Sequence, residues 1–154
     1  MKNLRDFKNF SLKEFDSLLI EKLNSWSLPV LRVSLGIVFI WFGALKPFGD
    51  SPANEVITKT IYWFDPDIFI PILGVWEILI GICLLYTPLL RFGLFLLALQ
   101  MPGTFLPLVL RPEICFIDAP FNLTLEGQYI IKNLVLIAAA MVVGGRLAPI
   151  KKQQ

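Results

Sequence analysis

A single carboxylate, Glu77, lies near the middle of the apolar stretch Ile68–Leu90, which contains no other charge. A stretch of this length can span the roughly 30 Å hydrocarbon core of a bilayer, for which about 20 residues suffice. An ionised group at the centre of such a helix costs about 2.5–3.5 kcal/mol on insertion scales. It is tolerated where it faces protein or trapped water and has a partner, so Glu77 predicts a polar site inside a helical bundle.

Further polar and aromatic side chains fall at comparable depths in the other apolar stretches. Glu77 lies about 13 Å from one membrane surface and Gln100 about 12 Å from the other, at 1.5 Å per helical residue, so both lie near the midplane. We predict a polar pocket that opens toward the outer surface, with Glu77 as its floor and Lys132 or Lys46 as its counter-charge. The candidate ligand-binding residues are Glu77, Lys132, Lys46, Gln100, Thr104, Asn133, Tyr129, Trp41 and Trp76.

Each candidate also has a purely structural interpretation. Glu77 paired with a lysine would fix the register of two helices, and Gln100 would donate an interhelical hydrogen bond. Lys46 would anchor a helix end at the membrane surface, as lysines near helix ends do. Trp41 and Trp76 would pack in the bundle, with a flat ligand held between them as the alternative.

Composition argues against several kinds of chemistry. The chain has 154 residues, of which 56% are hydrophobic and 17% charged, whereas soluble domains are roughly 25% charged. It has no histidine and two cysteines, Cys83 and Cys115, which do not form a CxxC pair. We therefore predict no catalytic residues, no metal site and no self-sufficient redox-cofactor site. The small net charge of +2, without a basic and aromatic surface cluster, predicts no nucleic-acid partner.

Four stretches are apolar enough to span a bilayer: about Leu28–Lys46, Ile68–Tyr86, Phe92–Leu110 and Gln128–Gly145. In the first three, glycines share a helix face with the polar residue, an arrangement that lets membrane helices approach closely. These glycines are Gly36 and Gly43, Gly74 and Gly81, and Gly93 and Gly103. In the third stretch, Pro102 and Pro107 are expected to kink the helix in its outer half.

The segment before the first span has a helical pattern of its own. Ser11 and Glu14 form a capping box that predicts a helix start. The apolar residues that follow recur at steps of three or four: Leu12, Phe15, Leu19, Leu23 and Trp26. This pattern predicts an amphipathic helix that lies in the membrane interface or packs on the cytoplasmic ends of the bundle.

The predicted fold is an all-α integral membrane protein, a four-transmembrane-helix bundle (28–146) with an N-terminal amphipathic interfacial segment (1–27) and a basic tail (147–154). Basic residues set its orientation. One side carries Lys2, Arg5, Lys8, Lys13, Lys22, Arg32, Arg91, Arg146, Lys151 and Lys152, and the other carries Lys46, Lys59, Arg111 and Lys132. This bias predicts cytoplasmic N- and C-termini, with the loops 47–67 and 111–127 facing outward.

Three stretches follow one another in a familiar order and spacing: RVSLGIVFIWFGALK (Arg32–Lys46), GVWEILIGICLL (Gly74–Leu85) and EGQYIIKNLVLIAAA (Glu126–Ala140). Over about residues 28–146 the chain resembles the DoxX-like superfamily of small bacterial inner-membrane proteins, and within it the YkgB/RclC-like branch. The resemblance implies a multi-pass four-helix bundle in the bacterial inner (cytoplasmic) membrane. It also implies a link to quinone-connected sulfur oxidation or to resistance against reactive chlorine and oxidants, but it assigns no catalytic residues.

Three functions are compatible with these features. In the first, a small lipophilic or polar-headed ligand such as a quinone binds above Glu77, and the protein is an accessory or subunit of a quinone-linked redox or oxidative-stress system. In the second, the bundle is a small carrier for a solute or protons, favoured by a broken third helix. In the third, it is a structural or assembly subunit that binds its own copies or a larger membrane complex. No cofactor follows from the residues, and a quinone is the candidate.

Overall fold

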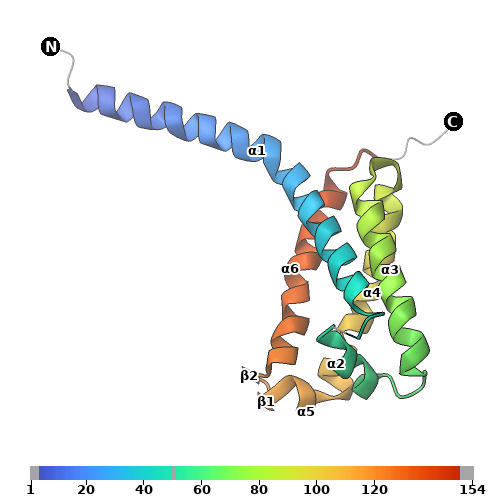
Figure 1. Ribbon diagram of the computed structural model, residues 1–154. Coiled ribbons are helices and arrows are strands. Elements are labelled where there is room, and N and C mark those ends of the chain that lie inside the picture. Colours follow the sequence, from blue (N-terminus) through green and yellow to red (C-terminus); the bar gives the residue numbers. More distant parts are fainter. Residues whose placement is uncertain (1–3, 50, 150–154) are drawn as a thin grey trace.

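The computed structural model describes residues 4–49 and 51–149 (Figure 1). Its long helices are α1 (Leu4–Leu45), α3 (Pro66–Leu85), α4 (Leu90–Leu110) and α6 (Leu125–Gly145). The shorter elements are α2 (Ala53–Thr60), the 3-10 helix η1 (Thr87–Leu89), α5 (Pro112–Cys115), β1 (Phe116–Asp118) and β2 (Asn122–Leu123). Four helices of the described chain are long and apolar enough to cross a membrane, as a multi-pass α-helical membrane protein requires.

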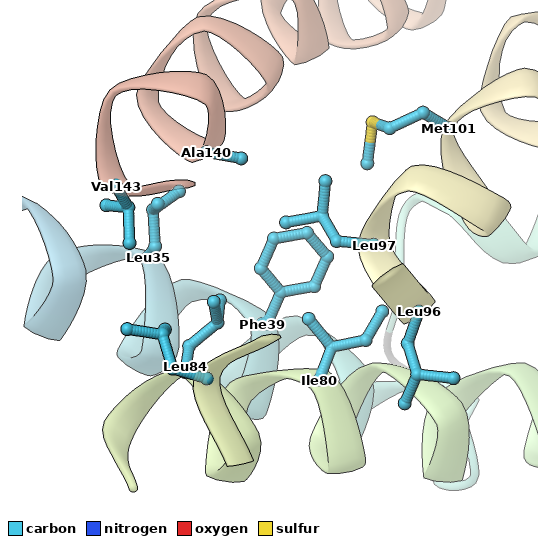
Figure 2. Packing of buried hydrophobic residues seen from close by; sticks show 10 residues of the cluster. Leu35, Phe39, Ile80, Leu84, Leu96, Leu97, Met101, Ala140 and Val143 are labelled. Atoms are coloured by element: carbon cyan, nitrogen blue, oxygen red, sulfur yellow. The ribbon is translucent and has the colours of Figure 1, made fainter. Parts of the chain in front are cut away.

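The four long helices form a closed bundle in which α1 packs on α3, α3 on α4, α4 on α6, and α6 again on α1 (Figure 1). Its interior is a cluster of ten buried apolar residues: Leu35, Phe39, Ile80, Leu84, Leu90, Leu96, Leu97, Met101, Ala140 and Val143 (Figure 2). Because lipid tails are as apolar as leucine, burial alone does not hold membrane helices together. Close packing and interhelical polar contacts must therefore supply the specificity of this bundle.

The outer faces of the spans are apolar as well. Trp41 on α1 is 65% exposed, Val75 on α3 62%, Phe95 on α4 60% and Met141 on α6 71%. Side chains of this size, exposed on all four spans, suit contact with the acyl chains of a bilayer rather than with water. The face that carries Trp41 lies opposite the glycine-bearing face of α1.

The first helix is longer than the sequence predicts. It begins already at Leu4, so the expected start at Ser11 is wrong, and it runs through Pro29 into the first span. The predicted boundary between residues 27 and 28 therefore falls inside one helix. Figure 1 shows that α1 changes direction part-way and that its N-terminal part projects away from the bundle. We attribute this bend to Pro29, since a proline inside a helix removes one backbone hydrogen bond and clashes with the preceding turn.

Local sequence signals set the other helix starts. Asp65 caps α3 by accepting a hydrogen bond from the backbone N–H of Asp67 at 3.0 Å, and Pro66 follows at the first helical position, where its missing N–H does no harm. Thr124 caps α6 in the same way through the N–H of Gly127, at 3.1 Å. Capping by Asp or Thr satisfies a backbone donor that the helix itself leaves unpaired.

The loops predicted to face outward are partly ordered into a cap at one end of the bundle (Figure 1). The first contains α2, and the second contains α5 and an antiparallel hairpin of β1 and β2, a small departure from the all-α prediction. The start of α6 packs tightly on α5, because a Cβ at Gly127 would lie 2.1 Å from the carbonyl oxygen of Cys115. Only glycine fits there.

Candidate functional site

Glu77 lies at the centre of a closed polar network that joins three segments of the bundle. Its Oε2 is 2.5 Å from Nζ of Lys46, which follows the last residue of α1. Its Oε1 accepts a hydrogen bond of 2.7 Å from Nε2 of Gln100 on α4. Glu77 is 8% exposed and Lys46 5%, so each charge is neutralised by the other away from solvent. Both carboxylate oxygens are therefore occupied by protein.

Glycines bring α1 and α3 close enough for this contact. A Cβ at Gly43 would lie 2.7 Å from the carbonyl oxygen of Gly74, and a Cβ at Gly81 would lie 2.6 Å from that of Gly36. Gly36 and Gly43 lie seven residues apart on α1, and Gly74 and Gly81 lie seven residues apart on α3. The two antiparallel helices therefore touch at two levels. Glu77 lies between these levels on α3. The predicted role of the small residues, close helix approach, is confirmed for this pair.

Arg32 forms a second polar contact between the same two helices, at the other end of the crossing. Its Nε donates to the carbonyl oxygen of Leu84 at 2.7 Å, and its Nη2 donates to that of Leu85 at 2.7 Å and to Oγ1 of Thr87 at 2.8 Å. Carbonyls in the last turn of a helix lack intrahelical donors, and the residue four positions after Leu84 is Pro88, which has no N–H. The guanidinium satisfies these acceptors and complements the helix dipole.

Replacing Arg32 by methionine should lower the free energy of unfolding by about 1.5–3 kcal/mol, the range for hydrogen bonds that involve a charged group. Arg32→Lys should recover only part of the loss, since an ammonium group cannot donate to both carbonyls in the fixed fork geometry of arginine. Unfolding in detergent, followed by circular dichroism, measures both changes. The exposed Lys13 supplies the control, Lys13→Met, and equal stability of the Arg32 and Lys13 variants would contradict this role.

The structure brings together three of the nine candidate residues and places the others elsewhere. Lys132 is exposed, with its ammonium 5.1 Å from the ring centre of Tyr129, so Lys46 and not Lys132 is the counter-charge. Asn133 donates to the carbonyl oxygens of Tyr129 and Ile130 in its own helix. Thr104 likewise donates to the carbonyl oxygen of Gln100, at 3.4 Å.

The two tryptophans also separate. Trp41 points outward, whereas Trp76 is half-buried and packs against the core cluster. They lie on different helices with opposite surroundings, so the alternative of a flat ligand between their rings is wrong. The indole Nε1–H of Trp76 is buried without a hydrogen-bond partner among the described residues, as is Oε1 of Gln100.

Part of the cap covers the side of the network that was predicted to open outward above Glu77. Asn54 of α2 donates to the carbonyl oxygen of Lys46 at 3.3 Å, so the ordered cap lies over that side of the network. Two grooves of the described residues are apolar, and neither is lined by Glu77, Lys46 or Gln100. No local pattern in the sequence predicts that residues 53–60 fold back over the end of α1.

The third span is also unbroken. α4 runs without interruption from Leu90 to Leu110 with Pro102 and Pro107 inside it, so the broken helix that favoured a carrier is not found. Neighbouring groups can compensate for prolines in membrane helices. Sequence reasoning missed the roles of two polar residues. Arg32 counted there only toward the charge bias, and the position of Thr124 before an apolar run was a readable capping signal.

The two cysteines are free and buried. Burial raises the pKa of the Cys115 thiol above its ordinary value, and the negative charges of Glu113 and Glu126 raise it further. A raised pKa keeps the thiol protonated at neutral pH, and the thiol is a poor nucleophile.

Maleimide should therefore label Cys115 slowly near pH 7, and the rate should rise only above the pH range in which an exposed cysteine becomes reactive. The measurement uses the folded protein in detergent in a Cys83→Ala background, with the denatured protein as the fast reference. Glu113→Gln removes one of the charges that raise the pKa, so its labelling should begin at lower pH. Labelling of the native protein as fast as that of the denatured one at pH 7 would contradict the assignment.

Together, the bundle, its apolar outer faces and its closed interior network define a multi-pass α-helical membrane protein whose intramembrane charges link helices to one another. No known protein family, curated protein or solved structure matches the chain in our comparisons.

Proposed function

We propose that this protein is an accessory or assembly subunit of a membrane-bound complex. The observation that supports this proposal most directly is the Lys46–Glu77–Gln100 network, in which both oxygens of the intramembrane carboxylate contact protein groups. A buried ion pair of this kind can fix the register of helices without taking part in chemistry. The network thus behaves as a helix-to-helix link, which is what a rigid membrane subunit needs.

The projecting part of α1 supports the same proposal. Residues 12–27 are exposed throughout. Five of their apolar side chains share one stripe, on which Phe15 and Trp26 are each 66% exposed: Leu12, Phe15, Leu19, Leu23 and Trp26. We assign this stripe to the membrane interface, where amphipathic helices place their apolar side. The opposite face, with Glu14, Ser17 and Glu21, then points to the cytoplasm and is free to bind a partner.

We infer the membrane and the orientation of the protein from the distribution of its basic residues and from the DoxX-like resemblance. Ten of the fourteen basic residues fall on the side of both termini, which places the termini in the cytoplasm by the positive-inside rule. The DoxX-like resemblance supports the bacterial inner membrane as the location, and quinone-linked redox chemistry or defence against oxidants as the role of the complex.

Purification of the full chain from its native membrane in mild detergent, followed by native mass spectrometry, tests the proposal. We expect a fixed stoichiometry with at least one other membrane protein, and hypochlorite sensitivity in a strain that lacks the chain. Glu21→Lys on the cytoplasmic face of α1 should weaken the complex, whereas Glu113→Lys, an equally exposed carboxylate at the opposite end, should not. Recovery of the chain alone or only with its own copies, with normal hypochlorite resistance in the deletion strain, would contradict the proposal.

A second candidate function, binding of a quinone beside the network, is favoured by one observation. The Nε1–H of Trp76 on α3 and Oε1 of Gln100 on α4 are a buried donor and a buried acceptor, and neither has a hydrogen-bond partner among the described residues. Buried polar groups are normally hydrogen-bonded to protein, water or a ligand. A small polar headgroup would satisfy both atoms.

Binding of decylubiquinone to the purified protein distinguishes the two candidates. Trp76→Phe removes the N–H and keeps an aromatic ring, so it should weaken quinone binding about tenfold, the effect of about 1.4 kcal/mol. Trp41→Phe is the matched control, since that ring faces outward. No measurable binding by the native protein, or equal loss in both variants, would leave the assembly function as the better assignment.

A further inference from the structure

An apolar groove of about 500 Å³ lies between α4 and α6, away from the polar network. Its lining from α4 includes Leu94, Ala98, Met101 and Phe105, and its lining from α6 includes Ile137 and Met141. Figure 2 shows Leu97 and Met101 pointing from α4 toward Ala140 of α6 at its inner wall. The volume is within the range of roughly 300–1,000 Å³ that is typical of small-molecule sites.

The shape and position of the groove suit a single hydrocarbon chain. Leu94 and Phe105 lie about 16 Å apart along α4 at 1.5 Å per residue, which is about half of the roughly 30 Å hydrocarbon core. Small residues keep it open, since Ala98 and Gly144 lie on its two walls. A Cβ added at Gly144 would lie 3.4 Å from Cδ1 of Leu94, so a side chain at this position would narrow the groove and glycine leaves it open. The groove is therefore about one leaflet deep and ends beside Leu94 and Gly144.

Two arginines flank that end of the groove. Arg91 lies one turn before Leu94, and Arg146 lies two residues after Gly144. The guanidinium of Arg91 donates through Nη2 to the carbonyl oxygen of Ala148, just beyond α6, and so bridges the two helices. Both side chains are exposed, and neither forms a salt bridge within the described residues. The groove thus has an apolar body and a cationic end where α4 begins and α6 ends (Figure 1).

We propose that this groove binds an anionic phospholipid, with one acyl chain between α4 and α6 and the phosphate against Arg91 and Arg146. Basic sites between membrane helices at the cytoplasmic surface bind the headgroups of anionic lipids. A helix from a second copy would match the apolar wall, but it would not account for two exposed arginines at one end. A zwitterionic lipid would fill the groove but would gain less from the arginines, since its headgroup carries a cation beside the phosphate.

Native mass spectrometry of the full chain in detergent tests this site. The probes are palmitoyl-oleoyl phosphatidylglycerol and palmitoyl-oleoyl phosphatidylcholine, which share acyl chains and differ in headgroup charge. We expect preferential retention of phosphatidylglycerol. Arg91→Gln and Arg146→Gln should each reduce that preference about fivefold, the effect of about 1 kcal/mol per basic residue near the membrane surface. Lys59→Gln, at the opposite end of the bundle, should leave the preference unchanged.

A second pair of variants tests the groove itself. Ala98→Phe fills it and should reduce retention of both lipids, whereas Ala138→Phe makes the same change on an exposed position of α6 outside the groove. Equal retention of the two lipids by the native protein would overturn the proposal. So would equal effects of the two phenylalanine variants, or a homodimer that retains no phosphatidylglycerol and dissociates on Ala98→Phe. If Ala98→Phe prevents folding, the arginine variants, which alter exposed side chains, still decide the outcome.

Discussion

Glu77→Ala should lower the free energy of unfolding by about 3–5 kcal/mol, the effect of removing one partner of a buried ion pair. The loss is large because the ammonium of Lys46, which is 5% exposed, would remain buried without a counter-charge. Gln100→Leu should have a smaller effect, since interhelical hydrogen bonds in membranes average about 0.6 kcal/mol and reach about 1.7. Reversible unfolding in mixed detergent micelles, followed by circular dichroism, gives both values.

A double variant distinguishes two causes of the lost stability: an unpaired buried charge and a general packing defect. Replacement of both Glu77 and Lys46 by methionine removes the two charges together and keeps side chains of similar length, so stability should return close to that of the native protein. Glu113→Gln, in an exposed pair with Arg111, is the control and should change stability by less than about 1 kcal/mol. A double variant as unstable as Glu77→Ala would show that the ion pair is not the cause.

Gly43→Val should separate α1 from α3 and reduce the free energy of unfolding by about 1–3 kcal/mol or more, as overpacking does. The first added carbon would lie 2.7 Å from the carbonyl oxygen of Gly74 and 2.9 Å from the backbone nitrogen of Ile78. Both neighbours are backbone atoms of a helix and cannot move independently. The same unfolding measurement applies, together with the amount of protein that accumulates in the membrane.

Gly103→Val is the matched control, because an added Cβ there meets no atom within 4 Å. Valine also has a better helix propensity than glycine, so this variant should be as stable as the native protein or slightly more stable. Separation of α1 from α3 should also pull Lys46 away from Glu77, so Glu77→Ala should cost less in the Gly43→Val background. Such non-additivity is measurable in a double-mutant cycle, and strictly additive effects would show that helix approach and ion pair are independent.

The span count and the polar interior were predictable from the sequence because length, hydropathy and helical period are local properties. The stretches around Phe39, Ile80 and Leu97 are long enough and apolar enough to be membrane helices in any arrangement. The glycines that share a face with Glu77 predicted where α1 and α3 meet, and the structure confirms that contact.

Other features depended on neighbours that are remote in sequence. Ser11 carries a local capping signal, but no helix begins there, because the segment before it also adopts helical backbone. Pro102 and Pro107 favoured a broken third span, yet both lie inside the continuous helix α4. The carbonyls of Leu84 and Leu85 were certain to need donors, but nothing local indicated that Arg32 supplies them.

Only the tertiary structure determines which lysine pairs with Glu77. Sequence determined the depth of each ionisable residue, because rise per residue is constant along a helix, and by that measure Lys46 and Lys132 were equivalent. It did not determine how each helix is rotated about its axis in the bundle. The close contact of Gly43 with Gly74 sets that rotation for α1 and α3 and aims Lys46 inward, while the packing of α6 leaves Lys132 on the outside beside Tyr129.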